Sequence, residues 1–297
     1  MKNACLQLFF IFFMLSATAQ EMYLIEETDS IQLFETYLSN TSTSNVFPAF
    51  YKNGLIYVSK YKDNFYNLFY SDLQSASIKI SLGNRFQFGA AVIHETEIYF
   101  TGISKRMDTK GYFNSTIYKG IMEDLKVKKI EKLDFCDKNF SYTDPSISAN
   151  GKQMVLVSSE KEFLHILEFV KNEVNEWEKK SVVFISHPNF DIINPTIYNE
   201  NTIYFSSNIF NGEIIGASYT TNKNDEIVLD KVKRAEGVFN IYKIERKQGS
   251  WGIPIKANEF NSEFDELGVL FDSEKSGYLT SFRYNGNDNI YYFILKQ

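Results

Sequence analysis

The sequence contains little cysteine, histidine or proline. Only two cysteines, three histidines and five prolines occur among 297 residues. Cys5 lies in an N-terminal leader, so Cys136 has no partner in the mature chain and an internal disulfide is excluded. His94, His165 and His187 are scattered without the spacing of metal ligands, and the glycines match no phosphate-binding motif. We therefore expect no metal site and no cofactor.

Long apolar runs and excess positive charge are also lacking. After the leader, no apolar run approaches the length needed to cross a bilayer, so we expect no transmembrane segment once the leader is removed. The chain carries 31 Lys and Arg residues against 37 Asp and Glu residues, a net charge of −6. This balance argues against nucleic acid and anionic membrane surfaces as partners.

The first residues are typical of a secretory signal peptide. Lys2 gives a positive start, residues 6–15 form a short apolar core, and residues 17–19 (Ala-Thr-Ala) resemble a cleavage site. We assign 1–19 to the signal peptide and 20–297 to a single domain, and we expect an exported protein.

The segment 140–159 is the clearest copy of a repeated strand–turn–strand unit. Asp144-Pro145 predicts an extended start, because proline fixes its own φ and biases the residue before it away from the helical region. Residues 149–152 (Ala-Asn-Gly-Lys) tolerate the backbone angles of a tight turn. Residues 154–157 form a continuous apolar run that is typical of a strand buried on both faces.

The unit recurs with a period of roughly 40 to 70 residues, the range that indicates propellers and other arrays. Two further copies contain the proline and two weaker ones do not; they occupy 47–59, 194–207, 89–101 and 268–281. Aromatic residues make up 16% of the chain and favour pleated, half-buried surfaces.

The pattern predicts an all-β fold, a five-bladed β-propeller of four-stranded antiparallel blades. The last unit is one strand short, and the segment 31–37 can supply that strand beside 291–295, so that both ends of the chain close the ring. The insertion 211–237 reads as a hairpin; a partial sixth blade is the alternative. Trp177 and Trp251 start the fourth strands of their units and are expected to pack between blades.

These residues resemble the TolB-type, WD-like propeller repeat, whose signature is an Asp-Pro start, a Ser-Pro-Asp-Gly-like turn and a Leu-Tyr-Phe-x-Ser strand. The best matches are 144–158 and 195–207. The order of units, and the segment 263–293 most of all, is similar to the propeller region of bacterial OmpA-family and type IX secretion-associated envelope proteins. The resemblance covers nearly all of the mature chain.

The resemblance implies a protein-interaction platform that is periplasmic or associated with the outer membrane. Peptidoglycan binding is not implied, because no OmpA-like module follows the propeller in a sequence that ends at Gln297. Our leading hypothesis is therefore a non-catalytic exported scaffold that binds an envelope protein through its rim and loops.

A carbohydrate-active or glycan-binding propeller is the alternative hypothesis. Glycosidases of five blades place carboxylates on the innermost strands, and the innermost strands expected here contain none; these are 49–51, 91–93, 146–148, 196–198 and 269–271. Asp144, Asp191, Asp265 and Glu266 precede these strands, on one expected rim of the ring. They are our candidate binding residues for a cation or a basic peptide; hydrogen bonding to their own loop backbone is the structural alternative.

Overall fold

The computed structural model describes residues 23–296 except 40, 61–65, 84–86, 161–162, 188–189, 210–213, 222–223, 225 and 235–236. The predicted signal peptide lies outside these described residues. All regular secondary structure in the described part of the chain is β-strand. No helix long and apolar enough to cross a membrane occurs among the residues described.

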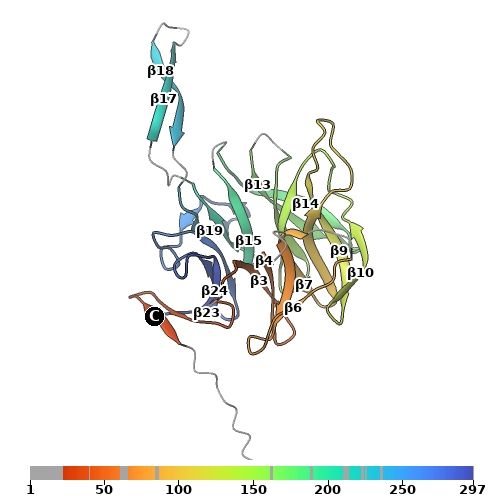
Figure 1. Cartoon of the computed structure of the whole chain (residues 1–297). Helices are drawn as coiled ribbons and strands as arrows, with labels where there is room; N and C mark the ends of the chain where they lie inside the picture. Colours follow the sequence, from red (N-terminus) through yellow and green to blue (C-terminus); the bar gives the residue numbers. More distant parts are fainter. Residues whose placement is uncertain are drawn as a thin grey trace, which may run out of the picture.

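The strands form five antiparallel blades around a ring (Figure 1), which confirms the predicted five-bladed propeller. The first blade comprises β3 (Asn45–Tyr51), β4 (Gly54–Lys60), β5 (Tyr66–Ser71) and β6 (Ile78–Lys79). The second comprises β7 (Gln87–His94), β8 (Glu97–Ile103), β9 (Ser115–Glu123) and β10 (Lys126–Lys132). The third comprises β11 (Tyr142–Ile147), β12 (Gln153–Ser158), β13 (His165–Lys171) and β14 (Trp177–Ile185).

The last two blades depart from the simple four-strand order. The fourth comprises β15 (Ile192–Asn199), β16 (Thr202–Ser207), β19 (Asn240–Lys247), β20 (Ser250–Trp251) and β21 (Ile255–Lys256). The fifth comprises β22 (Glu266–Phe271), β23 (Ser276–Ser281), β24 (Asn289–Leu295), β2 (Ile31–Phe34) and β1 (Leu24–Glu27). The first strands of the blades, β3, β7, β11, β15 and β22, contact one another in succession and form the inner wall of the ring.

The N-terminal strand closes the ring as predicted. Strand β2 pairs antiparallel with β24, with Ile31 opposite Leu295 and Phe34 opposite Tyr292. Leu33 is fully buried in this seam and packs in the same core cluster as Phe293. The closure therefore buries apolar side chains from both ends of the chain and leaves no open edge on β24.

The insertion forms a hairpin and not a sixth blade. Its strands, β17 (Ile214–Thr221) and β18 (Ile227–Arg234), pair with each other as a separate two-stranded sheet. Figure 1 shows this hairpin projecting from the fourth blade, well away from the ring.

The Xaa-Pro pairs mark bulges and not simple extended starts, so that expectation is wrong. Phe47, Asp144 and Asn194, each directly before a proline, have φ of 56°, 54° and 49°, and strand register shifts at each of them. Proline has no N–H to donate to the ladder, which favours an extra, unpaired residue in the strand. The innermost strands consequently continue through the bulge and begin earlier than the sequence indicated.

The core consists of apolar layers between neighbouring blades. Strand β12 is buried along its whole length, as its continuous apolar run predicted. Trp177 lies 6.0 Å from the ring of Tyr99 in the preceding blade, and Trp251 donates to Glu168 of the preceding blade at 3.4 Å. Both tryptophans therefore link adjacent blades, as expected.

Candidate functional site

Asp144 lies inside β11, contrary to the expected rim position. The residue is 6% exposed, and its carboxylate accepts hydrogen bonds from the backbone N–H groups of Ala90 in β7 (3.2 Å) and Asn194 in β15 (3.3 Å). Burial raises the pKa of Asp144, and the two amide hydrogen bonds oppose that rise. The carboxylate thus joins three innermost strands.

Close contacts of the same kind link β15 to β22 on the inner wall. Asn194 Nδ2 donates to the carbonyl of Leu267 in β22 at 3.3 Å. A Cβ atom at Gly268 would lie 1.9 Å from Asn194 Nδ2, and one at Gly89 would lie 2.5 Å from Asp144 Oδ1. A larger residue at either position would therefore displace the polar side chain of the neighbouring blade that reaches the backbone there.

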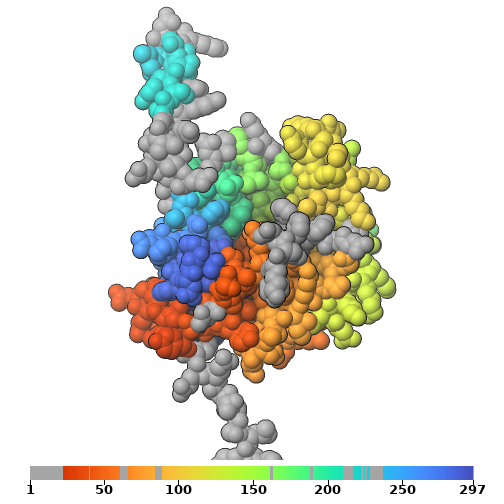
Figure 2. Space-filling view, viewed as in Figure 1, coloured from red at the N-terminus to blue at the C-terminus, as the bar shows by residue number. Residues whose placement is uncertain are grey.

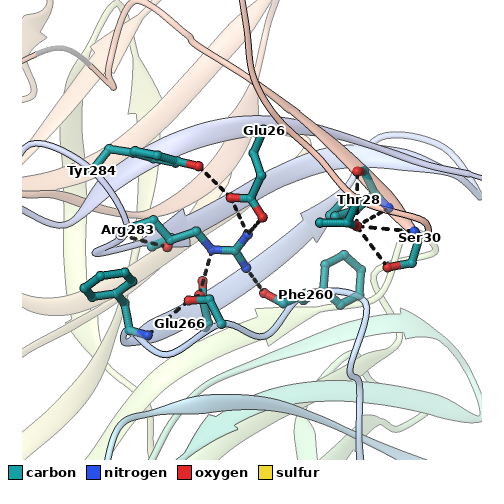
Figure 3. Close-up of polar contacts among 11 residues, drawn as sticks. Glu26, Thr28, Ser30, Phe260, Glu266, Arg283 and Tyr284 are labelled. Carbon is teal, nitrogen blue, oxygen red and sulfur yellow. Dashed lines mark hydrogen bonds and ion pairs between the residues drawn. The ribbon is translucent and has the colours of Figure 1, made fainter.

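Glu266 is the first residue of the innermost strand β22, whereas the sequence analysis expected it to precede that strand. Its buried Oε1 accepts from Arg283 Nε (2.9 Å) and Ser262 Oγ (2.6 Å), as Figure 3 shows for the arginine. Burial raises the pKa of Glu266 to about 7, although the Arg283 charge opposes this.

Arg283 connects Glu266 to the N-terminal strand (Figure 3). Its Nη1 donates to both carboxylate oxygens of Glu26 in β1, at 3.0 and 3.1 Å, and its Nη2 donates to the carbonyl of Phe260. Tyr284 adds a hydrogen bond from its hydroxyl to Glu26 at 2.6 Å. Two carboxylates share one guanidinium that is only 4% exposed, so this cluster is a buried clamp on the closing strands.

The remaining two predicted residues, Asp265 and Asp191, lie directly before β22 and β15, as predicted. Asp265 Oδ1 accepts from the backbone N–H of Phe239 at 2.7 Å, which ties the end of the insertion to the fifth blade. Asp191 is exposed, and its backbone N–H donates to Asn208 Oδ1 at 2.8 Å. The four acids are therefore divided among a buried inner-wall position, a buried clamp and two loop positions, with different partners at each.

The connection between β8 and β9 carries exposed apolar side chains that the sequence analysis did not single out. Met107, Tyr112 and Phe113 are 51%, 67% and 54% exposed. This loop and the hairpin both connect the second and third strands of a blade, and they project from the same end of the ring (Figure 1). Three large apolar side chains within seven residues were the signal that the sequence offered.

Polar contacts hold this loop in shape. Asp108 accepts hydrogen bonds from the backbone N–H groups of Lys110 and Tyr112, both at 2.8 Å. The hydrogen bond from Tyr112 is the main cause of the lowered pKa of Asp108. Asn114 Nδ2 donates to the carbonyl of Lys138 at 3.0 Å, which anchors the loop to the connection leading into the third blade. The exposed apolar side chains thus sit on an ordered support.

A polar cavity of about 690 Å³ lies between the second and third blades. It is lined by the β7–β8, β11–β12 and β13–β14 turns, including His94, Asn150 and Glu173. Lys171 also lines it, with its ammonium 3.6 Å from Glu97 Oε2 and 5.1 Å from the centre of the Trp177 ring. Among the described residues, no group of three or more His, Cys, Asp or Glu side chains could hold a metal ion.

Comparisons with known proteins identify the fold and no family. No family model matches the sequence, and no curated protein does. A GH32 beta-fructofuranosidase from Bombyx mori is similar with a TM-score of 0.51 and 13% identity, over 86% of this chain and 61% of that one. A gluconolactonase from Xanthomonas campestris has a TM-score of 0.51 and 9% identity, over 94% and 93% of the two chains.

TolB from Acinetobacter baumannii aligns with a TM-score of 0.47 and 11% identity, over 90% of this chain and 60% of TolB. This chain therefore spans about three fifths of the length of both the fructofuranosidase and TolB. At these identities the similarity to the fructofuranosidase and the gluconolactonase shows the fold alone and leaves the activity open, since one propeller architecture supports many functions.

Proposed function

We propose that this chain is a non-catalytic, exported β-propeller that acts as a protein-interaction scaffold in the bacterial cell envelope. The observation that carries the proposal is the exposed apolar group Met107, Tyr112 and Phe113 on an ordered loop. Large exposed apolar side chains gathered in one loop are typical of surfaces that another protein covers.

The loop has the physical properties of a binding anchor. Full burial of one large apolar side chain contributes about 1.5–3 kcal/mol, and aromatic residues dominate the energetics of interfaces. The hydrogen bonds of Asp108 hold the loop before any partner arrives, so less conformational entropy is lost on binding.

The engagement of the inner acids supports the non-catalytic reading. Asp144 accepts from two backbone amides, and Glu266 is paired with Arg283 and 0% exposed. A glycosidase needs two carboxyl groups that reach one substrate from opposite sides of the scissile bond. Here each acid already has partners of its own within the fold.

The leader and the resemblance to envelope propellers support the proposed location outside the cytoplasm. A positive residue, a short apolar core and a small-residue cleavage site direct export. Fractionation of bacteria producing the full chain should place the mature protein, shortened by about 19 residues, outside the cytoplasm. Recovery of the full-length chain in the cytoplasm would contradict export.

Capture from envelope extract tests the scaffold. The mature chain should retain a specific envelope protein, and the double variant Tyr112→Ala/Phe113→Ala should retain at least roughly tenfold less of it, because an aromatic anchor is lost. The control Val174→Ala removes an apolar side chain that is 72% exposed in the β13–β14 turn and should retain the partner fully. Failure of every form to capture a protein would reject the scaffold, and equal capture by all three would reject the loop as its binding surface.

The cavity between the second and third blades favours glycan binding as the second candidate function. Its volume of about 690 Å³ falls within the range of small-ligand sites, and its lining is polar. Binding of the mature chain and of Lys171→Met to an array of envelope glycans tests this candidate. Glycan binding by the wild-type chain that Lys171→Met loses would support it, and absence of binding would remove it.

A further inference from the structure

Where the structure describes the side chains of the hairpin β17–β18, neither face is covered by the propeller. Residues 217–221 of β17 are all exposed, although successive residues of a strand point to opposite faces. Tyr219 is 65% exposed and Ile227, the first residue of β18, is 78% exposed. Figure 2 shows the hairpin (cyan) standing clear of the ring. A two-stranded sheet of this kind is marginally stable in water and gains stability from further strands.

The two outer edges of the hairpin differ in charge. Strand β18 (IVLDKVKR) contains Asp230, Lys231, Lys233 and Arg234, whereas β17 (IIGASYTT) contains no charged residue and no proline. Charged residues, lysine above all, and proline are the devices that protect an edge strand from pairing with another chain. By sequence, therefore, β18 carries these protective residues and β17 carries none.

We propose that the β17 edge pairs with the β17 edge of a second copy of this chain. Antiparallel pairing of the two hairpins produces a four-stranded sheet in the order β18–β17–β17–β18, with two-fold symmetry. A strand of eight residues spans about 26 Å, so a full-length pairing continues the ladder over that length.

Charge favours a second copy as the occupant. In a symmetric pair each strand meets its own sequence, so any charged residue near the axis lies close to its like-charged copy and destabilises the pair. Strand β17 avoids this because it is uncharged. Each chain carries a net charge of −6, and an antiparallel arrangement of projecting hairpins keeps the two acidic rings at opposite ends of the shared sheet.

Sedimentation equilibrium of the mature chain over a range of concentrations tests the pairing. The wild-type chain should show twice the monomer mass. Ala217→Lys, at an exposed position near the middle of β17, should raise the dissociation constant at least tenfold. The control Ile227→Lys adds the same charge to the same hairpin, outside the β17 edge, and should leave the dimer intact.

Three results would overturn the inference: a wild-type monomer at all concentrations, a dimer of Ala217→Lys as tight as the wild type, or loss of the dimer in both variants. The inference goes beyond the proposed scaffold and is independent of it. A monomer that still captures an envelope protein through Tyr112 and Phe113 would reject the pairing and retain the scaffold; a dimer that captures nothing would do the reverse.

Discussion

Replacement of Arg283 by methionine should destabilise the propeller strongly at neutral and alkaline pH. The substitution removes the cation shared by Glu266, which is 0% exposed, and Glu26, whose side chain is 25% exposed. Breaking a buried ion pair by removal of one partner costs roughly 3–5 kcal/mol, because the other charge stays buried without compensation. Most of this cost falls on Glu266, since Glu26 retains contact with water and with Tyr284.

The cost depends on pH in a defined direction. Burial already raises the pKa of Glu266 from its ordinary 4.5 to about 7, and loss of the Arg283 charge raises it further. At pH 5 the carboxyl of the variant is protonated and needs no cation, so only hydrogen bonds are lost, about 1–3 kcal/mol. At pH 8 the wild-type carboxyl is ionised and paired, whereas the variant must keep its carboxyl protonated, which adds roughly 1.4 kcal/mol for each pH unit above the wild-type pKa of about 7.

Urea denaturation of Arg283→Met and wild type at pH 5 and pH 8 measures this difference. Lys128→Met, which breaks an exposed pair with Glu123, is the control and should change the unfolding free energy at neither pH. The double variant Glu266→Gln/Arg283→Met should be more stable than Arg283→Met at pH 8, because no buried charge remains. An equal cost of Arg283→Met at both pH values would refute the reasoning.

Three further predictions concern the ring. In the wild type, the free energy of unfolding should fall by about 3 kcal/mol as pH rises from about 5 to 8, because the folded pKa of Glu266 lies above its ordinary value of 4.5. Glu266→Gln should remove this decrease when stability is measured against pH. Leu33→Ala in the closing strand should cost about 2–5 kcal/mol in urea denaturation, whereas Phe264→Ala at a 38% exposed position should cost clearly less; equal costs would mean that the seam is not buried. The thiol of Cys136, 2% exposed, should react with a thiol reagent only on unfolding, and fast labelling of the native chain would contradict its burial.

The blade pattern could be predicted from the sequence because each unit carries local signals. The buried run of β12 and the pairing of β2 with β24 followed from apolar periodicity and from a count of strands per unit. The exact start of each innermost strand could not be predicted. The bulges at Phe47, Asp144 and Asn194 appear only when both strands are placed side by side.

The roles of the acids depended on residues remote in the sequence. Glu26 and Arg283 are 257 positions apart, and no local pattern pairs them. The sequence predicts a strand that begins after Pro145, which would place Asp144 at a rim. Because the strand continues through the bulge, Asp144 lies within β11, next to backbone amides of two other blades. The exposed side chains Tyr112 and Phe113 were visible in the sequence, but their exposure depends on a loop geometry set by Asp108.

Closure by β2 and β24 determines when the molecule can be completed. The first four blades and two strands of the fifth lie between β2 and β24 in the chain, so during synthesis β2 waits for all of them before its partner exists. Contacts between such remote segments carry a large loop-closure entropy and slow folding. A nonsense mutation before β24 would leave β2 paired with β1 alone, so that its other edge stays exposed to pairing with other chains and to quality-control proteases.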